Sequence, residues 1–244
     1  MTVKAFHYAA TLLLIQLLSG CDAPPSSTDV AQQQPARQEQ AAPAVQPQAP
    51  ADVNQPERLV VAFGDSLYAG YGLDRNEGLA PELQRALEAQ GIKATVYNAG
   101  VSGETTAGGR KRLAFTLDGL PRKPDLVMIG LGANDMLRGL DPEQAKENLD
   151  AMLAELKSRG IPAALTGMIA APNMGSAYAA KFNPIYAELA RKYDVPLYPF
   201  LLDGVVGEQD LLLPDGLHPN AAGVDRIAAG VAPMVAAALK PAPN

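Results

Sequence analysis

Four polar clusters, at residues 64–66, 102–105, 132–135 and 215–220, contain the side chains of this chain that could do chemistry. They supply a serine hydroxyl, an asparagine amide, glycines, and an aspartate and a histidine three positions apart. A serine becomes a nucleophile when a histidine takes its proton and a carboxylate orients that histidine. The set therefore indicates acyl transfer through a serine, although Gly-Asp-Ser at 64–66 is by itself typical of an ordinary turn that ends a strand.

His218 is the most informative of these residues. The chain has two histidines, and His7 lies in a segment that we expect to be removed. A histidine base in the mature protein must therefore be His218, and the spacing lets Asp215 accept from one ring nitrogen while the other faces Ser66. The domain has one histidine and no cysteine, which leaves few nitrogen or sulfur ligands for a metal. We therefore expect neither a metal nor a cofactor. A metal site made only of oxygen ligands is the alternative.

The elements that must position these clusters form an α/β alternation in residues 57–244. Apolar β-branched runs predict strands, and apolar residues spaced three and four apart predict helices. Such alternation is typical of a parallel sheet covered on both faces, here a three-layer α/β/α sandwich with five strands. Since parallel strands present their carboxyl ends at one edge, we expect the polar clusters to meet there. Strands are predicted at 59–63, 95–97, 125–131, 163–168 and 195–198, and helices at 77–90, 106–117, 142–159, 178–193 and 220–239.

The net charge and the cysteine count restrict the partners and the covalent links that we expect for this chain. The net charge is −6 and no basic stripe is visible, so nucleic acid is not an expected partner. The single cysteine, Cys21, excludes a disulfide within the chain. We expect a monomer, although no pattern in the sequence determines the oligomeric state.

Residues 1–20 have the pattern of a targeting signal, with a positive Lys4 and an apolar stretch at 11–18 that is too short to span a bilayer comfortably. The signal leads into Leu-Ser-Gly-Cys at 18–21, which resembles the lipobox of bacterial lipoproteins, where the cysteine carries the lipid. The resemblance implies a lipoprotein of the bacterial cell envelope that faces the periplasm and is anchored in a membrane through Cys21. A plain secretory signal with an incidental Cys21 is the alternative, and the choice between inner and outer membrane stays open.

Residues 21–56 are predicted to be a disordered tether between Cys21 and the domain at 57–244. The 35 residues from 22 to 56 include 8 Gln, 8 Ala and 7 Pro and almost nothing large and apolar. Such a segment cannot bury enough surface to offset its ordering entropy. Fully extended it could reach roughly 110 Å at about 3.3 Å per residue. A segment that binds the cell wall or a partner is the alternative.

The polar clusters and their surroundings resemble the four sequence blocks of the SGNH, or GDSL, hydrolase family in order and spacing. The resemblance extends over essentially 57–240 and is strongest to the branch of thioesterases, lysophospholipases and arylesterases. One departure is GAND at 132–135, where that branch often has GGND, and it leaves Asn134 in place. The matching stretches are GDSLYAGYGL, NAGVSGETT, GLGANDMLRGL, YDVPLYPFLL and DGLHPNAAG.

The resemblance implies a flavodoxin-like SGNH hydrolase fold and a serine ester hydrolase. Carried over by position, Ser66 is the nucleophile, His218 the base and Asp215 its orienting carboxylate. The implied oxyanion hole consists of the backbone N–H groups of Ser66 and Gly103 and the side-chain amide of Asn134. The implied substrates are small aryl and acyl esters, extending to thioesters and lysophospholipids. The alternatives are a carbohydrate O-acetyl esterase of the cell envelope and a non-catalytic binding lipoprotein.

Several further residues carry weaker signals. Asp65 is expected to hold its turn and Asp135 to be structural, because Asp215 already supplies the triad carboxylate. The Arg-Lys-Arg run at 110–112 is interpreted as a solvated helix face. The loop at 169–176 resembles the substrate loop of the thioesterase branch. Residues predicted to line an acyl pocket are Tyr68, Tyr71, Met136, Met174 and Tyr178.

Overall fold

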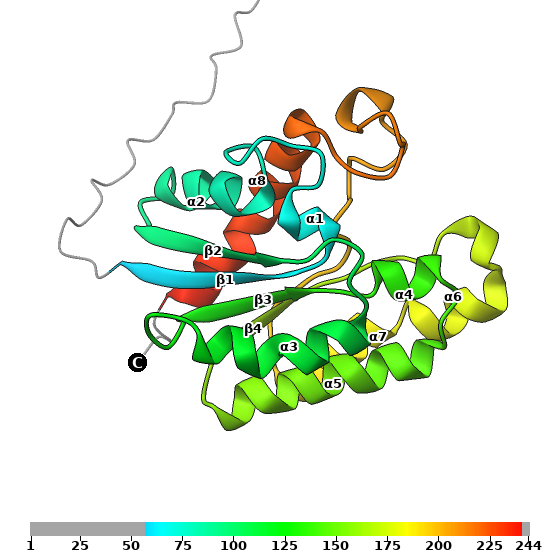
Figure 1. Ribbon diagram of the computed structural model, residues 1–244, viewed down its shortest axis with the longest axis horizontal. Coiled ribbons are helices and arrows are strands. Elements are labelled where there is room, and N and C mark those ends of the chain that lie inside the picture. Colours follow the sequence, from blue (N-terminus) through cyan, green and yellow to red (C-terminus); the bar gives the residue numbers. More distant parts are fainter. Residues whose placement is uncertain (1–56, 241–244) are drawn as a thin grey trace, which may run out of the picture. The chain divides into compact units, whose positions relative to one another are not determined.

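The computed structural model describes residues 57–240, which alternate strands and helices as expected (Figure 1). The predicted signal at 1–20 and the tether at 21–56, including Cys21, lie outside the described residues. They therefore stay predictions, as does the boundary of the folded domain at 57.

The described strands form one parallel sheet in the order β2-β1-β3-β4-β5. This is the doubly wound order of flavodoxin-like folds, so the predicted α/β architecture is confirmed. The order reverses direction between β1 and β3, and open sheets bind ligands at the carboxyl ends of the strands beside such a switch point. The strands are β1 (Arg58–Gly64), β2 (Ala94–Gly100), β3 (Leu126–Gly130), β4 (Ala163–Thr166) and β5 (Leu197–Tyr198).

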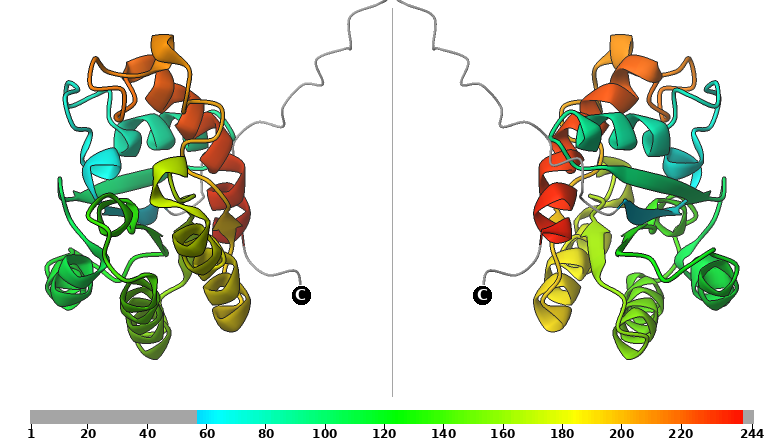
Figure 2. Two further views of the ribbon diagram at one scale, coloured as in Figure 1. Left: turned by 90° about the vertical axis from the view of Figure 1, so that its right-hand side faces the viewer. Right: turned by 90° about the vertical axis from the view of Figure 1, so that its left-hand side faces the viewer.

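Helices cover both faces of the sheet, which explains why nearly every residue of β1, β3 and β4 is buried (Figure 2). One layer contains α2 (Leu79–Glu88) and α8 (Ala221–Leu239), and the other contains α3 (Thr106–Asp118), α5 (Pro142–Ser158) and α7 (Ile185–Tyr193). By length and composition α8 could cross a membrane, but half of its apolar stretch is buried inside the domain, as in a core helix.

The predicted helix at 178–193 is wrong, because the structure has two helices there. Helix α6 (Ser176–Phe182) ends before Asn183-Pro184, and α7 begins at Ile185. Pro184 has no N–H to continue the helical hydrogen bonds, so the helix is interrupted there although Asn183 keeps helical backbone angles. Asn183 gains a different role at the break, since its side-chain oxygen accepts from the N–H of Ala170 at 2.8 Å.

Other differences are smaller and also have local causes. The predicted strand at 195–198 shortens to β5, because Pro196 cannot donate to a neighbouring strand, although its carbonyl accepts from Leu165 N–H at 2.9 Å. Four short elements were not predicted, since fewer than two turns give no readable periodicity. They are α1 (Ser66–Ala69), α4 (Ala133–Leu137), and the 3-10 turns η1 (Pro172–Met174) and η2 (Gln209–Leu211).

Candidate active site

Ser66 lies where β1 ends and the short helix α1 begins. The Asp65 side chain caps that helix by accepting the N–H of Leu67 at 3.1 Å, which confirms its predicted turn-holding role. N–H groups in the first turn of a helix have no partner within it, so the Ser66 N–H is directed outward beside its own hydroxyl. Gly64 must be glycine, because a Cβ there would lie 2.4 Å from the Tyr68 ring.

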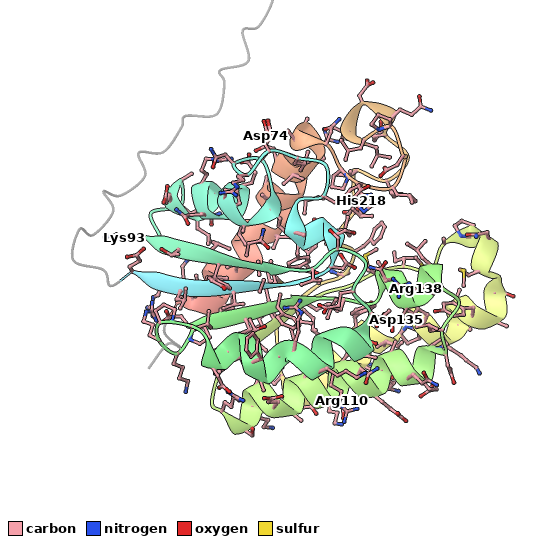
Figure 3. All side chains as sticks on the ribbon, viewed as in Figure 1. Asp74, Lys93, Arg110, Asp135, Arg138 and His218 are labelled. Carbon is pink, nitrogen blue, oxygen red and sulfur yellow. The ribbon has the colours of Figure 1, made fainter. Side chains whose placement is uncertain are left out.

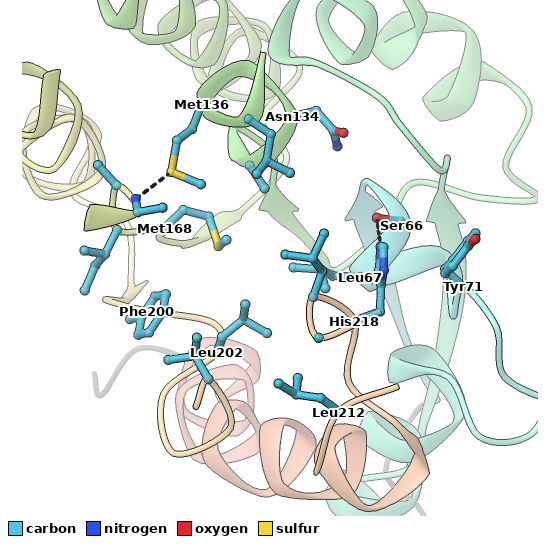
Figure 4. A pocket seen from close by; sticks show the side chains of 18 of the residues that line it. Ser66, Leu67, Tyr71, Asn134, Met136, Met168, Phe200, Leu202, Leu212 and His218 are labelled. Atoms are coloured by element: carbon cyan, nitrogen blue, oxygen red, sulfur yellow. Dashed lines mark hydrogen bonds between the residues drawn. The ribbon is translucent and has the colours of Figure 1, made fainter. Parts of the chain in front are cut away.

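The structure joins Ser66, His218 and Asp215 in one chain of hydrogen bonds. The Ser66 hydroxyl lies 2.8 Å from His218 Nε2 (Figure 4). On the other side of the ring, His218 Nδ1 lies 2.7 Å from Asp215 Oδ2. The other oxygen of Asp215 accepts the N–H groups of Leu217 at 2.9 Å and His218 at 3.0 Å. The loop before α8 thus carries both partners of the serine, as the three-residue spacing predicted.

Backbone hydrogen bonds keep Asp215 ionised to a lower pH than an ordinary aspartate. The N–H groups of His218 and Leu217, followed by the imidazole, lower the pKa of this carboxyl to about 2. An ionised Asp215 accepts a hydrogen bond from the N–H at Nδ1, so the proton stays on Nδ1 and the lone pair of Nε2 faces Ser66. The electrostatics therefore favour the tautomer in which the imidazole can remove the hydroxyl proton.

Gly103 and Asn134, the other residues expected in an oxyanion hole, line the same pocket as Ser66. Gly103 is the third residue of a turn closed by a 3.1 Å bond from Glu104 N–H to Val101 O, and its φ of 78° is one that glycine adopts readily. Asn134 lies on α4, and its amide donates to Asp65 Oδ2 at 3.3 Å. That leaves a second amide hydrogen for a ligand.

Arg138, at the end of α4, joins these two segments. Its guanidinium donates to the Gly103 carbonyl at 2.7 Å. Figure 3 shows Arg138 and His218 toward the same end of the sheet, opposite Lys93, which precedes β2. The carboxyl ends of the strands therefore gather all the predicted polar clusters, as parallel topology requires.

The Asp65 carboxyl is buried beside this site. Burial raises its pKa to about 6, and the hydrogen bonds from Leu67 and Asn134 offset only part of that rise. In the unfolded chain the same carboxyl titrates near 3.8. The folded state thus holds this proton more tightly than the unfolded state does.

We expect Asp65 to make folding less favourable as the pH rises from about 4 to about 6. The full effect is about 3 kcal/mol, at about 1.4 kcal/mol per pKa unit. Urea unfolding of the wild type and of Asp65→Asn at several pH values in this range measures the contribution of Asp65, because the variant has no carboxyl proton to lose. The free energy of unfolding of the wild type should fall relative to that of the variant. A difference that does not change with pH would contradict the assigned pKa.

An apolar pocket of about 650 Å³ opens beside Ser66 and His218 (Figure 4). Of the predicted lining residues, Tyr71 and Met136 are present, and the Tyr71 ring lies 4.5 Å from that of His218. Tyr68 is instead fully buried, with its hydroxyl 2.7 Å from Thr166 Oγ1. Met174 and Tyr178 are also absent from the lining, so those three predictions were wrong.

Most of the pocket wall was not predicted from the sequence. Residues 169–172 of the expected substrate loop contribute, but more of the lining comes from residues after β5. Phe200 and Leu202 lie in the family-like stretch YDVPLYPFLL, and the signal for the others was a run of apolar residues outside any predicted element, between 203 and 213. The apolar residues missed by the prediction include Leu67, Met168, Phe200, Leu202, Val206 and Leu212.

Two weaker expectations have opposite outcomes. Asp135 is structural as predicted, since it is buried and accepts the N–H and the hydroxyl of Thr106 at 2.8 and 2.6 Å. Arg112 was wrongly placed on a solvated face. Arg110 and Lys111 are exposed, but Arg112 turns inward and pairs with Glu104.

No group of three or more potential metal-ligating side chains occurs within 57–240.

A doubly wound sheet with a serine hydroxyl, an imidazole and a carboxylate linked at its switch point defines a serine hydrolase. The comparison with protein families then makes the assignment specific. Residues 62–226 match the model of the GDSL-like Lipase/Acylhydrolase family, and the chain belongs to that family. It is a carboxylic ester hydrolase with the SGNH hydrolase fold.

Bacterial relatives support this assignment at substantial identity. Esterase TesA of Pseudomonas aeruginosa is 38% identical over 178 residues, which cover 73% of this chain and 88% of TesA. An arylesterase of Vibrio mimicus is 40% identical over 164 residues, covering 67% of this chain and 80% of the relative. The crystal structure of AlinE4, an SGNH-hydrolase family esterase, is 48% identical with a TM-score of 0.65 and covers 77% of this chain and 99% of AlinE4.

Proposed function

We propose that this enzyme hydrolyses aryl and acyl esters, including thioesters and lysophospholipids, through an acyl-enzyme on Ser66. The observation that carries the proposal is the 2.8 Å contact between Ser66 Oγ and His218 Nε2 at an apolar pocket. The pocket volume is within the range of sites that enclose small organic ligands. An apolar wall favours an acyl or aryl group over a sugar, which needs hydrogen-bonding partners.

In the first half of the reaction, Ser66 Oγ attacks the carbonyl carbon while His218 Nε2 takes the hydroxyl proton. Asp215 stabilises the imidazolium that forms. When the tetrahedral intermediate collapses, its bond to the leaving oxygen or sulfur breaks, and the imidazolium returns the proton to that atom. The products are an acyl ester on Ser66 and a free alcohol or thiol.

In the second half, a water molecule replaces the leaving group. His218 takes a proton from the water as its oxygen attacks the acyl ester, and the proton then passes to Ser66 Oγ as the acid leaves. Both halves develop a negative oxygen that the N–H groups of Ser66 and Gly103 and the amide of Asn134 would stabilise. The same three donors therefore serve both steps.

Asn134→Ala should lower kcat by about 10²–10³-fold, the usual effect of losing one oxyanion donor. The fold should survive, because Asn134 is only half-buried and Asp65 keeps its bond to Leu67. Steady-state kinetics with a p-nitrophenyl ester, together with a thermal melt, would measure both effects. A kcat close to that of the wild type would show that Asn134 is not an oxyanion donor.

A substrate panel tests the proposed specificity. It includes p-nitrophenyl esters from acetate to palmitate, an acyl-CoA, a lysophosphatidylcholine and an acetylated xylo-oligosaccharide. Each buried methylene contributes about 0.8 kcal/mol, so kcat/KM should rise about fourfold per carbon until the chain exceeds the pocket. A preference for the acetylated sugar would favour the O-acetyl esterase alternative instead.

We also propose that the enzyme works in the bacterial cell envelope, anchored through a lipid on Cys21. The support is the Leu-Ser-Gly-Cys sequence at 18–21 and the bacterial origin of the relatives. Cell fractionation of the full chain tests the anchor. The wild type should be found with membranes and Cys21→Ser in the soluble fraction, and a variant found wholly with membranes would contradict the proposal.

A further inference from the structure

Arg112 is the one residue of the Arg-Lys-Arg run at 110–112 that turns toward the sheet. It lies in the middle of α3, and its guanidinium carbon is 3.9 Å from the centre of the fully buried Phe63 ring. Its side chain is 21% exposed, whereas Arg110 is exposed and points away from the sheet (Figure 3). An arginine held over an aromatic face and largely removed from water has a fixed orientation.

The Arg112 guanidinium binds the ends of two neighbouring strands. Its Nη2 donates to the carbonyl of Ala99 in β2 at 2.8 Å and to that of Gly64 in β1 at 3.2 Å. Gly64 lies two residues before Ser66, and its carbonyl also accepts the N–H of Val101 at 3.0 Å. Arg112 is therefore attached to the backbone at the point where β1 passes into the serine turn.

The same guanidinium binds the turn that carries Gly103. Its Nε donates to both carboxylate oxygens of Glu104, at 2.8 and 2.7 Å, and the Glu104 side chain is only 9% exposed. Glu104 is the last residue of the 101–104 turn and follows Gly103 directly. Val101 and Ser102 are exposed, so few other contacts hold this turn in place.

Two glycines in α3 make this arrangement possible. A Cβ at Gly109 would lie 2.3 Å from Leu131 Cδ1, so the missing side chain lets α3 approach the sheet closely. A Cβ at Gly108 would lie 3.1 Å from Glu104 Cγ, so the second glycine leaves room for the buried carboxylate. Glycine is unfavourable inside a helix, and here Gly108 accommodates the Glu104 side chain while Gly109 accommodates Leu131 and Phe63.

We propose that Arg112 is a positioning residue that sets the separation of the Ser66 and Gly103 N–H groups. The inference rests on the proposed function, in which these groups bind the oxyanion. Donors stabilise a transition state only when they are held where the charge develops. Without Arg112, the 101–104 turn keeps its bonds to Gly64 and Arg138 and still leads into α3 through Thr105, but Glu104 loses its side-chain contact with the middle of α3. Transition-state binding then weakens more than substrate binding does.

Arg112→Gln and Arg112→Lys test this role, with Arg110→Gln as the matched control on the same helix. Titrating Ser66 with a fluorophosphonate gives kcat per folded site. We expect kcat on p-nitrophenyl butyrate to fall about 10- to 100-fold, less than for loss of a whole donor, while KM stays within about threefold. Lysine should not rescue activity, because one ammonium cannot replace the planar fork that binds Glu104 and two carbonyls together. Arg110→Gln should match the wild type.

If the Arg112 variants fold poorly, Glu104→Gln tests the same role, because it removes the charge of the Glu104 side chain and keeps its shape. Glu104→Gln should also lower kcat, by a smaller factor than the Arg112 variants do. Affinity for a trifluoromethyl ketone, whose adduct carries an oxyanion, should fall in parallel with kcat. If Arg112 and Glu104 variants keep wild-type kcat, or change only stability or KM, the positioning role is wrong. A wild type with no esterase activity would instead contradict the proposed function.

Discussion

Ser66→Ala should lower kcat on a p-nitrophenyl ester by about 10⁴–10⁶-fold, the largest effect expected of any substitution in this chain. The reason is that His218 Nε2, 2.8 Å from the hydroxyl in the wild type, then has no nucleophile to deprotonate. The remaining rate would come from the oxyanion donors acting on water. Because the change removes one oxygen from a half-buried side chain, the fold should survive.

The matched measurement for Ser66→Ala is covalent labelling by a fluorophosphonate. The wild type should be labelled once, on the peptide that contains Ser66, and the variant should not be labelled. Ser176→Ala is a suitable control, because that serine is exposed at the start of α6 and does not line the pocket. Labelling of another serine, such as Ser102 in the same pocket, would show that the nucleophile has been assigned wrongly.

Asp215→Asn should lower kcat by about 10⁴-fold while leaving the fold intact. In the wild type, the ionised carboxylate accepts a hydrogen bond from the N–H at His218 Nδ1, with a distance of 2.7 Å. An asparagine amide can donate to Nδ1 instead, which moves the imidazole proton to Nε2. The imidazole then presents an N–H to Ser66, whereas deprotonation of the hydroxyl needs a lone pair there. The substitution should therefore lower kcat through the wrong tautomer and leave substrate binding unchanged.

Nitrogen-15 NMR of the imidazole would measure the tautomer beside kcat. His218 is the only histidine in 57–244, so its ring signals are readily assigned. The proton should lie on Nδ1 in the wild type and on Nε2 in Asp215→Asn. Asp203→Asn, an exposed aspartate between β5 and η2, should change neither the tautomer nor kcat. A fall in kcat below tenfold, or an unchanged tautomer, would count against the assigned role of Asp215.

The order of the polar clusters and the class of fold were predictable from the sequence, because both depend on local patterns. Alternating strand and helix periodicities require a parallel sheet, and a parallel sheet brings its carboxyl ends to one edge. That topology is enough to place Ser66 near Asn134, 68 positions away, before any contact is known. The elimination of other histidines then singled out His218 as the candidate base.

The sequence interpretation failed where the outcome depends on which side chains pack together. Arg112 looks like its exposed neighbours in a charged run, and only the approach of α3 to the sheet determines that it turns toward Phe63 and Glu104. Tyr68 was expected in the pocket, but its ring fills the space above Gly64 in the core. Periodicity cannot separate core from pocket wall, because both are apolar.

By itself, the sequence determined the residue types for the chemistry, the order of the elements and the edge of the sheet where they meet. Each of these follows from local propensity and from the rule that parallel strands share a direction. Only the tertiary structure decided the hydrogen-bond lengths of the triad, the pocket wall and the contacts of Arg112. These depend on packing between segments far apart in the chain, such as the 152 positions between Ser66 and His218, and no local pattern encodes them.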